Sequence, residues 1–257
     1  MNDAITDIRD DLSTGALADA HREPASNRRV ALGRILITGG ASGLGQAVAR
    51  AVSDAGGTPA VLDRDTPAIG DVLGRRVDVS LRDDVASAVA ETVGRLGGLD
   101  GVVTAAGIDR CGRLDEVAAD EWERVIAVNL LGTVSTVRAA LPALMKTHGR
   151  VVTVASSLAL RAVGEATAYC ASKFGVLGFS RALAAETRGQ IGVTTLIPAG
   201  MNTHFFDDRD EQYRPGADAK LNDPRDVASA VVFALGQPRG CEVRELVICQ
   251  EEEPSWP

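Results

Sequence analysis

The chain has 257 residues, a length that suits one large α/β domain or at most two small ones. Its 27 Lys and Arg residues against 35 Asp and Glu residues give a net charge of -8, which disfavours nucleic acid or an anionic membrane as a partner. No apolar run approaches the roughly 18 residues that a membrane span needs. The acidic first residues contain no hydrophobic stretch of a secretory signal.

Cysteine and histidine are scarce. The chain holds four cysteines and three histidines, namely Cys111, Cys170, Cys241, Cys249, His21, His148 and His204. No two cysteines have the CxxC spacing of a zinc site, so we predict no metal site. Reduced thiols in a cytoplasmic protein are the simpler interpretation.

Residues 1–30 read as an appendage to the domain. Ile5, Ile8 and Leu12 have helical spacing, which is compatible with a short amphipathic helix. A disordered tail fits these residues equally well. We therefore predict an N-terminal extension over 1–30 and one domain over 31–257.

From residue 31 onward, short apolar runs alternate with amphipathic stretches. The predicted strands lie at 34–38, 59–63 and 75–79, within 99–107, and at 150–156, 193–198 and 244–249. The predicted helices span 44–55, 83–96, 119–145 as one or two helices, 169–188 and 224–235, the last capped by Asp223 with Pro224 in its first turn. Such alternation predicts a parallel sheet that is covered by helices on both faces.

A glycine-rich loop follows the first predicted strand and opens the first helix. It reads TGGASGLG from Thr38 to Gly45. The pyrophosphate of a dinucleotide needs close approach of the backbone and the positive end of a helix. Side chains at Gly43 and Gly45 would obstruct that approach, so the loop predicts a dinucleotide site.

Asp63 ends the second predicted strand, 18 residues after Gly45. A carboxylate there can accept both hydroxyls of the adenosine ribose and would repel a 2′-phosphate. Arg64 follows it, and an arginine nearby can serve NADP instead. No basic residue occurs within the glycine loop, so we favour NAD, with NADP as the alternative.

Tyr169 and Lys173 stand four residues apart in a predicted helix and therefore share one face. A phenol titrates near pH 10 in water. A nearby ammonium and the positive nicotinamide of an oxidised cofactor are expected to lower the pKa of Tyr169. We predict that Tyr169 is a general acid/base, with a packing pair as the competing interpretation.

The spacing TGxxxGxG together with the Tyr169-x-x-x-Lys173 pair resembles the short-chain dehydrogenase/reductase family. This resemblance implies a single Rossmann-type, doubly wound α/β domain with a seven-stranded parallel sheet in the order 3-2-1-4-5-6-7. It also implies hydride transfer between NAD(H) and a small-molecule alcohol or carbonyl substrate. Relatives are often homo-oligomers, so a tetramer or dimer is expected.

The resemblance also assigns roles to individual residues. Ser156, with Ser157 as backup, orients the substrate; Tyr169 exchanges its proton; Lys173 holds the nicotinamide ribose; and Asn129 supports a proton relay through a water. The implied cofactor contacts are Thr38, Gly39, Ser42, Gly43, Leu44, Gly45, Asp63, Arg64, Asp78, Val79, Ala105, Ala106, Gly107, Tyr169, Lys173, Pro198 and Thr203. Ala105 stands where the family usually has asparagine, and Ala199 where it usually has glycine.

The segment 204–221 should be the substrate lid. Its Phe205 and Phe206 either line an apolar pocket or dock the lid. Arg209 and Arg214 either bind an acidic substrate or are ordinary exposed arginines, and the second interpretation is favoured because exposed arginine is commonplace. Two other functions stay open. An NADPH-dependent 3-oxoacyl carrier-protein reductase is disfavoured by Asp63, and a non-catalytic dinucleotide-binding protein is disfavoured by the complete catalytic set.

Overall fold

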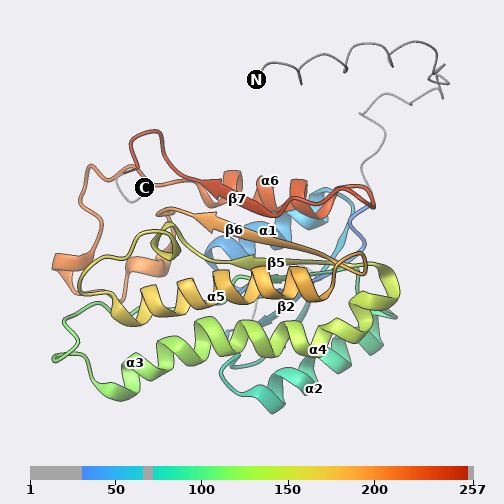
Figure 1. Ribbon diagram of the computed structural model, residues 1–257, viewed down its shortest axis with the longest axis horizontal. Coiled ribbons are helices and arrows are strands. Elements are labelled where there is room, and N and C mark those ends of the chain that lie inside the picture. Colours follow the sequence, from blue (N-terminus) through green and yellow to red (C-terminus); the bar gives the residue numbers. More distant parts are fainter. Residues whose placement is uncertain (1–30, 66–71, 254–257) are drawn as a thin grey trace, which may run out of the picture.

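The computed structural model describes residues 31–65 and 72–253, so the extension predicted for 1–30 lies outside the described residues. Within the described part, one parallel sheet has the strand order β3-β2-β1-β4-β5-β6-β7, which confirms the predicted fold (Figure 1). The strands are β1 (Arg34–Thr38), β2 (Thr58–Asp63), β3 (Leu73–Arg76), β4 (Gly101–Thr104), β5 (Arg150–Val154), β6 (Gly192–Pro198) and β7 (Glu245–Ile248).

Helices cover both faces of the sheet, as the alternation of strands and helices predicts. The α-helices are α1 (Gly43–Asp54), α2 (Arg82–Leu96), α3 (Ala119–Ile126), α4 (Gly132–Thr147), α5 (Thr167–Glu186) and α6 (Pro224–Leu235). Helices α1 and α6 lie on one face, whereas α2, α4 and α5 lie on the other (Figure 1). The predicted cap of α6 is confirmed, because the Asp223 side chain accepts a hydrogen bond from the Arg225 N–H.

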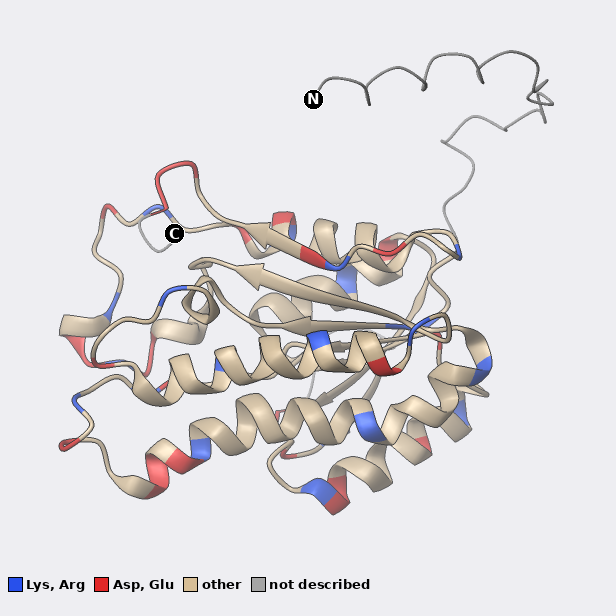
Figure 2. Ribbon diagram, viewed as in Figure 1, with Lys and Arg blue, Asp and Glu red and all other residues tan. Residues whose placement is uncertain are grey.

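The core is split by the alternation of side chains along each strand. In β1, Ile35 and Ile37 pack with Val48 of α1, while Leu36 packs with Leu144 of α4 on the opposite face. The side chains of Ile35, Leu36 and Ile37 are essentially inaccessible to solvent. A strand buried on both faces must be apolar at every position, which explains its continuous hydrophobic run. Charged side chains lie mostly on the helices and loops (Figure 2).

Strand β3 differs from its prediction at 75–79. Its pairing with β2 spans Leu73 to Arg76 and ends there, although the Val77 N–H still donates to the Asp63 carbonyl. Val77 and Val79 are buried in the core beyond the strand. Their apolar character therefore comes from burial in a loop, which the sequence pattern does not separate from burial in a strand.

The stretch predicted as one or two helices over 119–145 is a continuous helical segment that changes its winding. A π-helical turn, η2 (Ala127–Leu131), joins α3 to α4, and Pro142 lies inside α4. The segment Ala119–Thr147 is the one described helix whose length and mean hydropathy match a membrane span, contrary to expectation. In this fold it packs against α2 and α5, the position of a core helix.

The lid predicted at 204–221 follows β6 and contains two short 3-10 turns, η4 (His204–Phe206) and η5 (Glu211–Tyr213). Its two ends are tied together by an isolated bridge between Met201 and Asn222. The loop thus leaves from the carboxyl end of the parallel sheet and returns to it. Ligands bind at this end of doubly wound sheets.

Candidate active site

A cavity of about 460 Å³ opens at the carboxyl ends of the central strands, between the glycine loop and the lid. This volume lies within the usual range of small-molecule sites, roughly 300–1,000 Å³. Most of the predicted site residues line it: Gly39, Ser42, Gly43, Leu44, Gly45, Asp63, Arg64, Asp78, Val79, Ala105, Ala106, Gly107, Ser156, Tyr169, Lys173, Pro198 and Thr203. The two that do not, Thr38 and Asn129, are buried behind its wall.

The glycine loop is held in a conformation that only glycine allows. A Cβ at Gly45 would lie 2.1 Å from the Gly39 carbonyl oxygen, and one at Gly39, whose φ is 72°, would lie 2.6 Å from the Ala106 backbone. Within the described chain, the Ser42 side chain makes no capping hydrogen bond to α1, and the first turn of α1 carries no acidic residue. The positive end of α1 therefore faces the cavity without a side-chain anion, which fits a pyrophosphate.

Thr38 acts behind the cavity wall. Its hydroxyl accepts a hydrogen bond from the Ala106 N–H at 3.4 Å, and its carbonyl accepts one from the Ala105 N–H at 3.2 Å. These bonds connect the loops that follow β1 and β4. Thr38 therefore supports residues that line the cavity. Thr38 itself does not line the cavity, although a direct contact with a cofactor was predicted for it.

The acidic end of the cavity is built by two carboxylates with different partners. Asp63 accepts hydrogen bonds from the N–H groups of Ala41 at 2.8 Å and Asp65 at 3.0 Å, so it also fixes the glycine loop. Asp78 accepts from Ser80 and pairs with Arg124 at 2.9 Å. Although burial opposes the effect, these partners lower the pKa of Asp78 to about 2. Arg64 is exposed beside Asp63.

The predicted catalytic side chains meet at the opposite end. Lys173 lies one turn after Tyr169 in α5, with its Nζ 5.6 Å from the centre of the Tyr169 ring. The Lys173 ammonium donates a hydrogen bond to the Val154 carbonyl at 2.9 Å. Ser156 follows β5, where its hydroxyl caps a 3-10 turn by accepting from the Leu158 N–H, and it lines the cavity together with Tyr169.

Burial dominates the acid–base properties of this pair. It raises the pKa of Tyr169 to about 12, and the hydrogen bond with Ser156 offsets only part of that rise. It also lowers the pKa of Lys173 to about 8. Burial and the charge of Asp109 raise the pKa of Tyr169, while Ser156 and Arg209 oppose the rise. The lowering expected from the sequence depends also on the positive nicotinamide of an oxidised cofactor and stays a prediction.

Asn129 lies in the π-helical turn, with its side chain directed at the loop after β4. Its Nδ2 donates to the Ile108 carbonyl at 2.9 Å and to the Ser172 hydroxyl at 3.0 Å, while its Oδ1 accepts from the Ile108 N–H at 2.8 Å. The Asn129 side chain thus replaces a backbone partner for Ile108. The side-chain amide of Asn129 is committed to these groups. Its part in a proton relay through a water stays a prediction.

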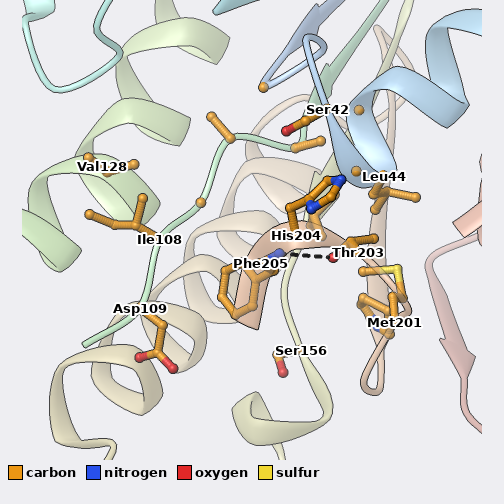
Figure 3. A pocket seen from close by; sticks show the side chains of 18 of the residues that line it. Ser42, Leu44, Ile108, Asp109, Val128, Ser156, Met201, Thr203, His204 and Phe205 are labelled. Carbon is orange, nitrogen blue, oxygen red and sulfur yellow. Dashed lines mark hydrogen bonds between the residues drawn. The ribbon is translucent and has the colours of Figure 1, made fainter. Parts of the chain in front are cut away.

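The lid contributes an ion pair that the sequence did not reveal. Arg209 pairs with Asp109, which follows β4, with 2.6 Å between Nη2 and Oδ2. The Arg209 guanidinium lies 4.6 Å from the ring centre of Phe206 and 5.5 Å from that of Phe205. Phe205 in turn lies 5.8 Å from Tyr169. Asp109, Phe205 and Ser156 gather at one end of the cavity and Ser42 and Leu44 at the other (Figure 3).

The sequence left two interpretations of Arg209 and Arg214, as ligands for an acidic substrate or as ordinary exposed arginines. In the structure Arg209 is neutralised by Asp109, and Arg214 donates to the carbonyls of Arg209 and Asp207. Asp109 was missed because 100 positions separate it from Arg209. The available signal was only that Asp109 lies two residues after the predicted Ala105–Gly107 cofactor segment.

Comparisons with known proteins give one consistent result. The family model described as short chain dehydrogenase matches residues 34–214. An uncharacterized oxidoreductase of Staphylococcus saprophyticus is 29% identical over 227 residues, which cover 83% of this chain and 95% of that protein. A similar uncharacterized oxidoreductase of Staphylococcus aureus is 29% identical over 224 residues, with the same coverages.

Solved structures share the fold. The aldohexose dehydrogenase of Thermoplasma acidophilum, in ligand-free form, has a TM-score of 0.77 at 24% identity, covering 84% of this chain and 92% of that one. An alcohol dehydrogenase of the archaeon Thermococcus sibiricus, complexed with 5-hydroxy-NADP, has a TM-score of 0.75 at 27% identity, with coverages of 84% and 95%.

Proposed function

The chain belongs to the short-chain dehydrogenase family, which consists of oxidoreductases, and from this premise we propose that it transfers a hydride between NAD(H) and an alcohol or carbonyl group. The observation that carries the proposal is the single cavity in which the glycine loop and the side chains of Ser156, Tyr169 and Lys173 meet. A cofactor site that opens directly onto an acid–base pair is the arrangement that hydride transfer with proton exchange requires.

The residues present fit a dinucleotide. The uncapped N-terminus of α1 and the close-packed glycines would hold its pyrophosphate, Asp63 its adenosine ribose, and Lys173 its nicotinamide ribose. When bound, the nicotinamide supplies the hydride donor or acceptor. Pro198 and Thr203, which follow β6, line the same cavity and would complete the site on the lid side.

The chain's own groups handle the proton. Ser156 and Tyr169 line the same cavity, so an oxygen of the substrate placed between the two hydroxyls would be oriented by one and protonated by the other. With a pKa raised to about 12, Tyr169 is protonated at neutral pH and is ready to act as the acid in carbonyl reduction. In the reverse direction Tyr169 would accept the alcohol proton.

The proposal favours NAD over NADP. Asp63 lines the cavity at the end of β2, and its negative charge opposes a 2′-phosphate. Arg64 lines the cavity as well and is the residue that would favour NADP. The Thermococcus relative was solved with an NADP analogue, so the preference must be measured for this chain.

We also propose that the protein is cytoplasmic and forms a homo-oligomer, a tetramer or dimer. Leu131 and Phe174 support assembly, since both remain substantially exposed on helical segments that pack against each other. Large exposed apolar side chains grouped on one face are typical of subunit contacts. Light scattering of the purified protein measures the mass of the assembly. A mass that corresponds to a monomer would reject the proposed oligomer.

The first experiment is a fluorescence titration with NADH and NADPH, followed by a screen of alcohols and ketones with the preferred cofactor. We expect tighter binding of NADH and cofactor-dependent turnover of secondary alcohols or their ketones. Tighter binding of NADPH would assign the selecting role to Arg64. Binding of neither cofactor would reject the proposed function.

A further inference from the structure

The pair of Asp109 and Arg209 is the least ordinary feature of the cavity. Both residues line it, yet the Asp109 side chain is only 2% exposed and the Arg209 side chain 18%. Charged side chains are rarely buried to this extent unless they are paired. The Asp109 carboxylate thus supplies the counter-charge of a guanidinium held inside the candidate substrate pocket.

Asp109 and Arg209 each make further hydrogen bonds besides the ion pair. Asp109 also accepts a hydrogen bond from the Arg110 N–H at 2.7 Å and one from the Cys111 thiol at 3.3 Å. Arg209 donates through Nη1 to the Tyr213 carbonyl, while its buried Nε has no hydrogen-bond partner among the described residues. The Nε–H of Arg209 is therefore an unmet buried donor, whereas the charge of the guanidinium is already compensated by Asp109.

Aromatic rings close the pocket beside this pair. Arg209 lies over both Phe206 and Phe205, and Phe205 contacts the ring of Tyr169. The two phenylalanines form an apolar wall between the ion pair and the proposed acid. A neutral, apolar substituent next to the reacting carbon would pack well on that wall.

The charges of Asp109 and Arg209 influence the pKa values of the proposed reacting groups. Asp109 adds to the rise in the pKa of Tyr169 that burial causes, and Arg209 opposes it. Asp109 also raises the pKa of Lys173 against the effect of burial. These effects place the ion pair within electrostatic range of any charged group on a substrate bound at Tyr169.

We propose that Asp109 determines substrate specificity: by neutralising Arg209 it makes the pocket select neutral alcohols and ketones over substrates that carry a carboxylate. This inference rests on the proposed oxidoreductase function and names its substrate class. An arginine in an apolar pocket is an efficient carboxylate binder. Here the position of the incoming carboxylate is taken by the side chain of Asp109, which an anionic substrate would have to displace.

The test compares 2-oxo esters with the corresponding 2-oxo acids, which share a reacting ketone and differ in one charge. For the wild-type protein we expect kcat/KM to be at least about tenfold higher for the esters, given the 1.5–3 kcal/mol of a charge-assisted hydrogen bond. In Asp109→Asn the guanidinium is released, and the ester-to-acid ratio should fall by about 10- to 100-fold. A wild-type preference for acids, or an unchanged ratio in Asp109→Asn, would overturn the proposal.

Two further variants keep the test decisive. Arg209→Gln leaves Asp109 as an unpaired anion, so turnover of the acids should fall further, and a gain would contradict the proposal. This comparison still decides if Asp109→Asn does not fold. Asp115→Asn removes the same charge from an exposed pair with Arg113 and should keep the wild-type ratio.

A binding measurement separates this inference from the proposed function. Calorimetric titration with isobutyrate in the presence of NADH should show binding to Asp109→Asn and none to the wild-type protein. Equal affinity of isobutyrate for both would reject the role of Asp109. Failure of the proposed function would instead appear as absence of NADH-dependent turnover of every ester and acid, while the difference in isobutyrate binding persists.

Discussion

The ammonium of Lys173 donates a hydrogen bond to the carbonyl of Val154, the last residue of β5, and is shielded from solvent with only 5% of the residue exposed. One hydrogen bond to a neutral carbonyl does not replace the hydration of a charge. Burial accordingly lowers the pKa of Lys173 to about 8 from its ordinary value of 10.5.

This shift predicts a pH-dependent stability. Between pH 8 and 10.5 the unfolded chain holds a proton on Lys173 that the folded chain has lost, so the free energy of unfolding rises with pH through this window. The contribution should reach about 3.5 kcal/mol over the whole window, at roughly 1.4 kcal/mol per pH unit, and about 2 kcal/mol by pH 9.5. Urea unfolding at pH 7.5, 8.5 and 9.5 measures it.

Two partly buried groups change the free energy of unfolding in the opposite direction, so the experiment needs a control variant. The pKa values of Tyr169 and Cys111 are both raised to about 12, mainly by burial, so their ionisation in the unfolded chain lowers stability at high pH. We therefore compare wild type with Lys173→Met, in which those contributions remain. The stability of the wild type relative to Lys173→Met should increase with pH, and a constant difference would contradict the assigned pKa.

Replacing Tyr169 by phenylalanine removes only the phenolic oxygen. Because the ring and its contact with Phe205 are retained, we expect kcat to fall by about 10²- to 10⁴-fold with little change in NADH affinity. Initial rates and fluorescence titration measure the two effects. Tyr213→Phe, which alters the chain's other tyrosine in the lid, should keep most of the activity. Retained turnover in Tyr169→Phe would reject its role as the acid/base.

Local patterns in the sequence are sufficient to predict most of the residues that line the cavity around the glycine loop and Tyr169. The glycine loop and the Tyr169–Lys173 pair each lie within one strand–helix unit, where spacing determines which groups share a face. The strand order followed from a family resemblance and is confirmed by the structure. The glycine loop and the Tyr169–Lys173 pair could be predicted because they depend on residues that are close together in the sequence.

The sequence did not predict which residues distant along the chain pair with each other. Asp109 is one of 35 acidic residues, and nothing in its neighbourhood selects Arg209 as its partner. The apolar residues Val77 and Val79 resemble a strand but are buried in a loop. The raised pKa of Tyr169 depends on burial in the folded protein, where Phe205 of the lid packs against the Tyr169 ring. Such properties require the tertiary structure because residues distant in sequence create them.

Removing the charge of Asp63 should change the cofactor preference. In Asp63→Asn the amide oxygen can still accept from the Ala41 N–H, so the glycine loop is preserved while the repulsion of a 2′-phosphate is lost. We expect the ratio of NADP to NAD in kcat/KM to rise by about 10- to 100-fold, in line with 1.5–3 kcal/mol for a hydrogen bond to a charged group. Asp63→Ala should raise the ratio similarly and also lower stability. An unchanged ratio in both variants would show that specificity is determined elsewhere.

Asn129 provides a test that separates a structural from a relay function. Its side chain binds both the N–H and the carbonyl of Ile108, the residue that precedes Asp109. In Asn129→Leu both backbone groups lose this partner, which should lower the free energy of unfolding by about 2–6 kcal/mol, at about 1–3 kcal/mol for each unsatisfied group. Ser172→Ala removes one bond to Asn129 and one to the Tyr169 carbonyl and should cost less, about 1 kcal/mol.

The two functions predict different results when stability and rate are measured together. If Asn129 positions the loop that carries Asp109, Asn129→Leu should lose stability and also change the KM of neutral substrates, because Asp109 and Arg209 border the pocket. If Asn129 serves only a proton relay, kcat should fall while the urea midpoint and KM stay at wild-type values. We expect the first outcome, because its amide nitrogen donates to two protein groups and its amide oxygen accepts from a third.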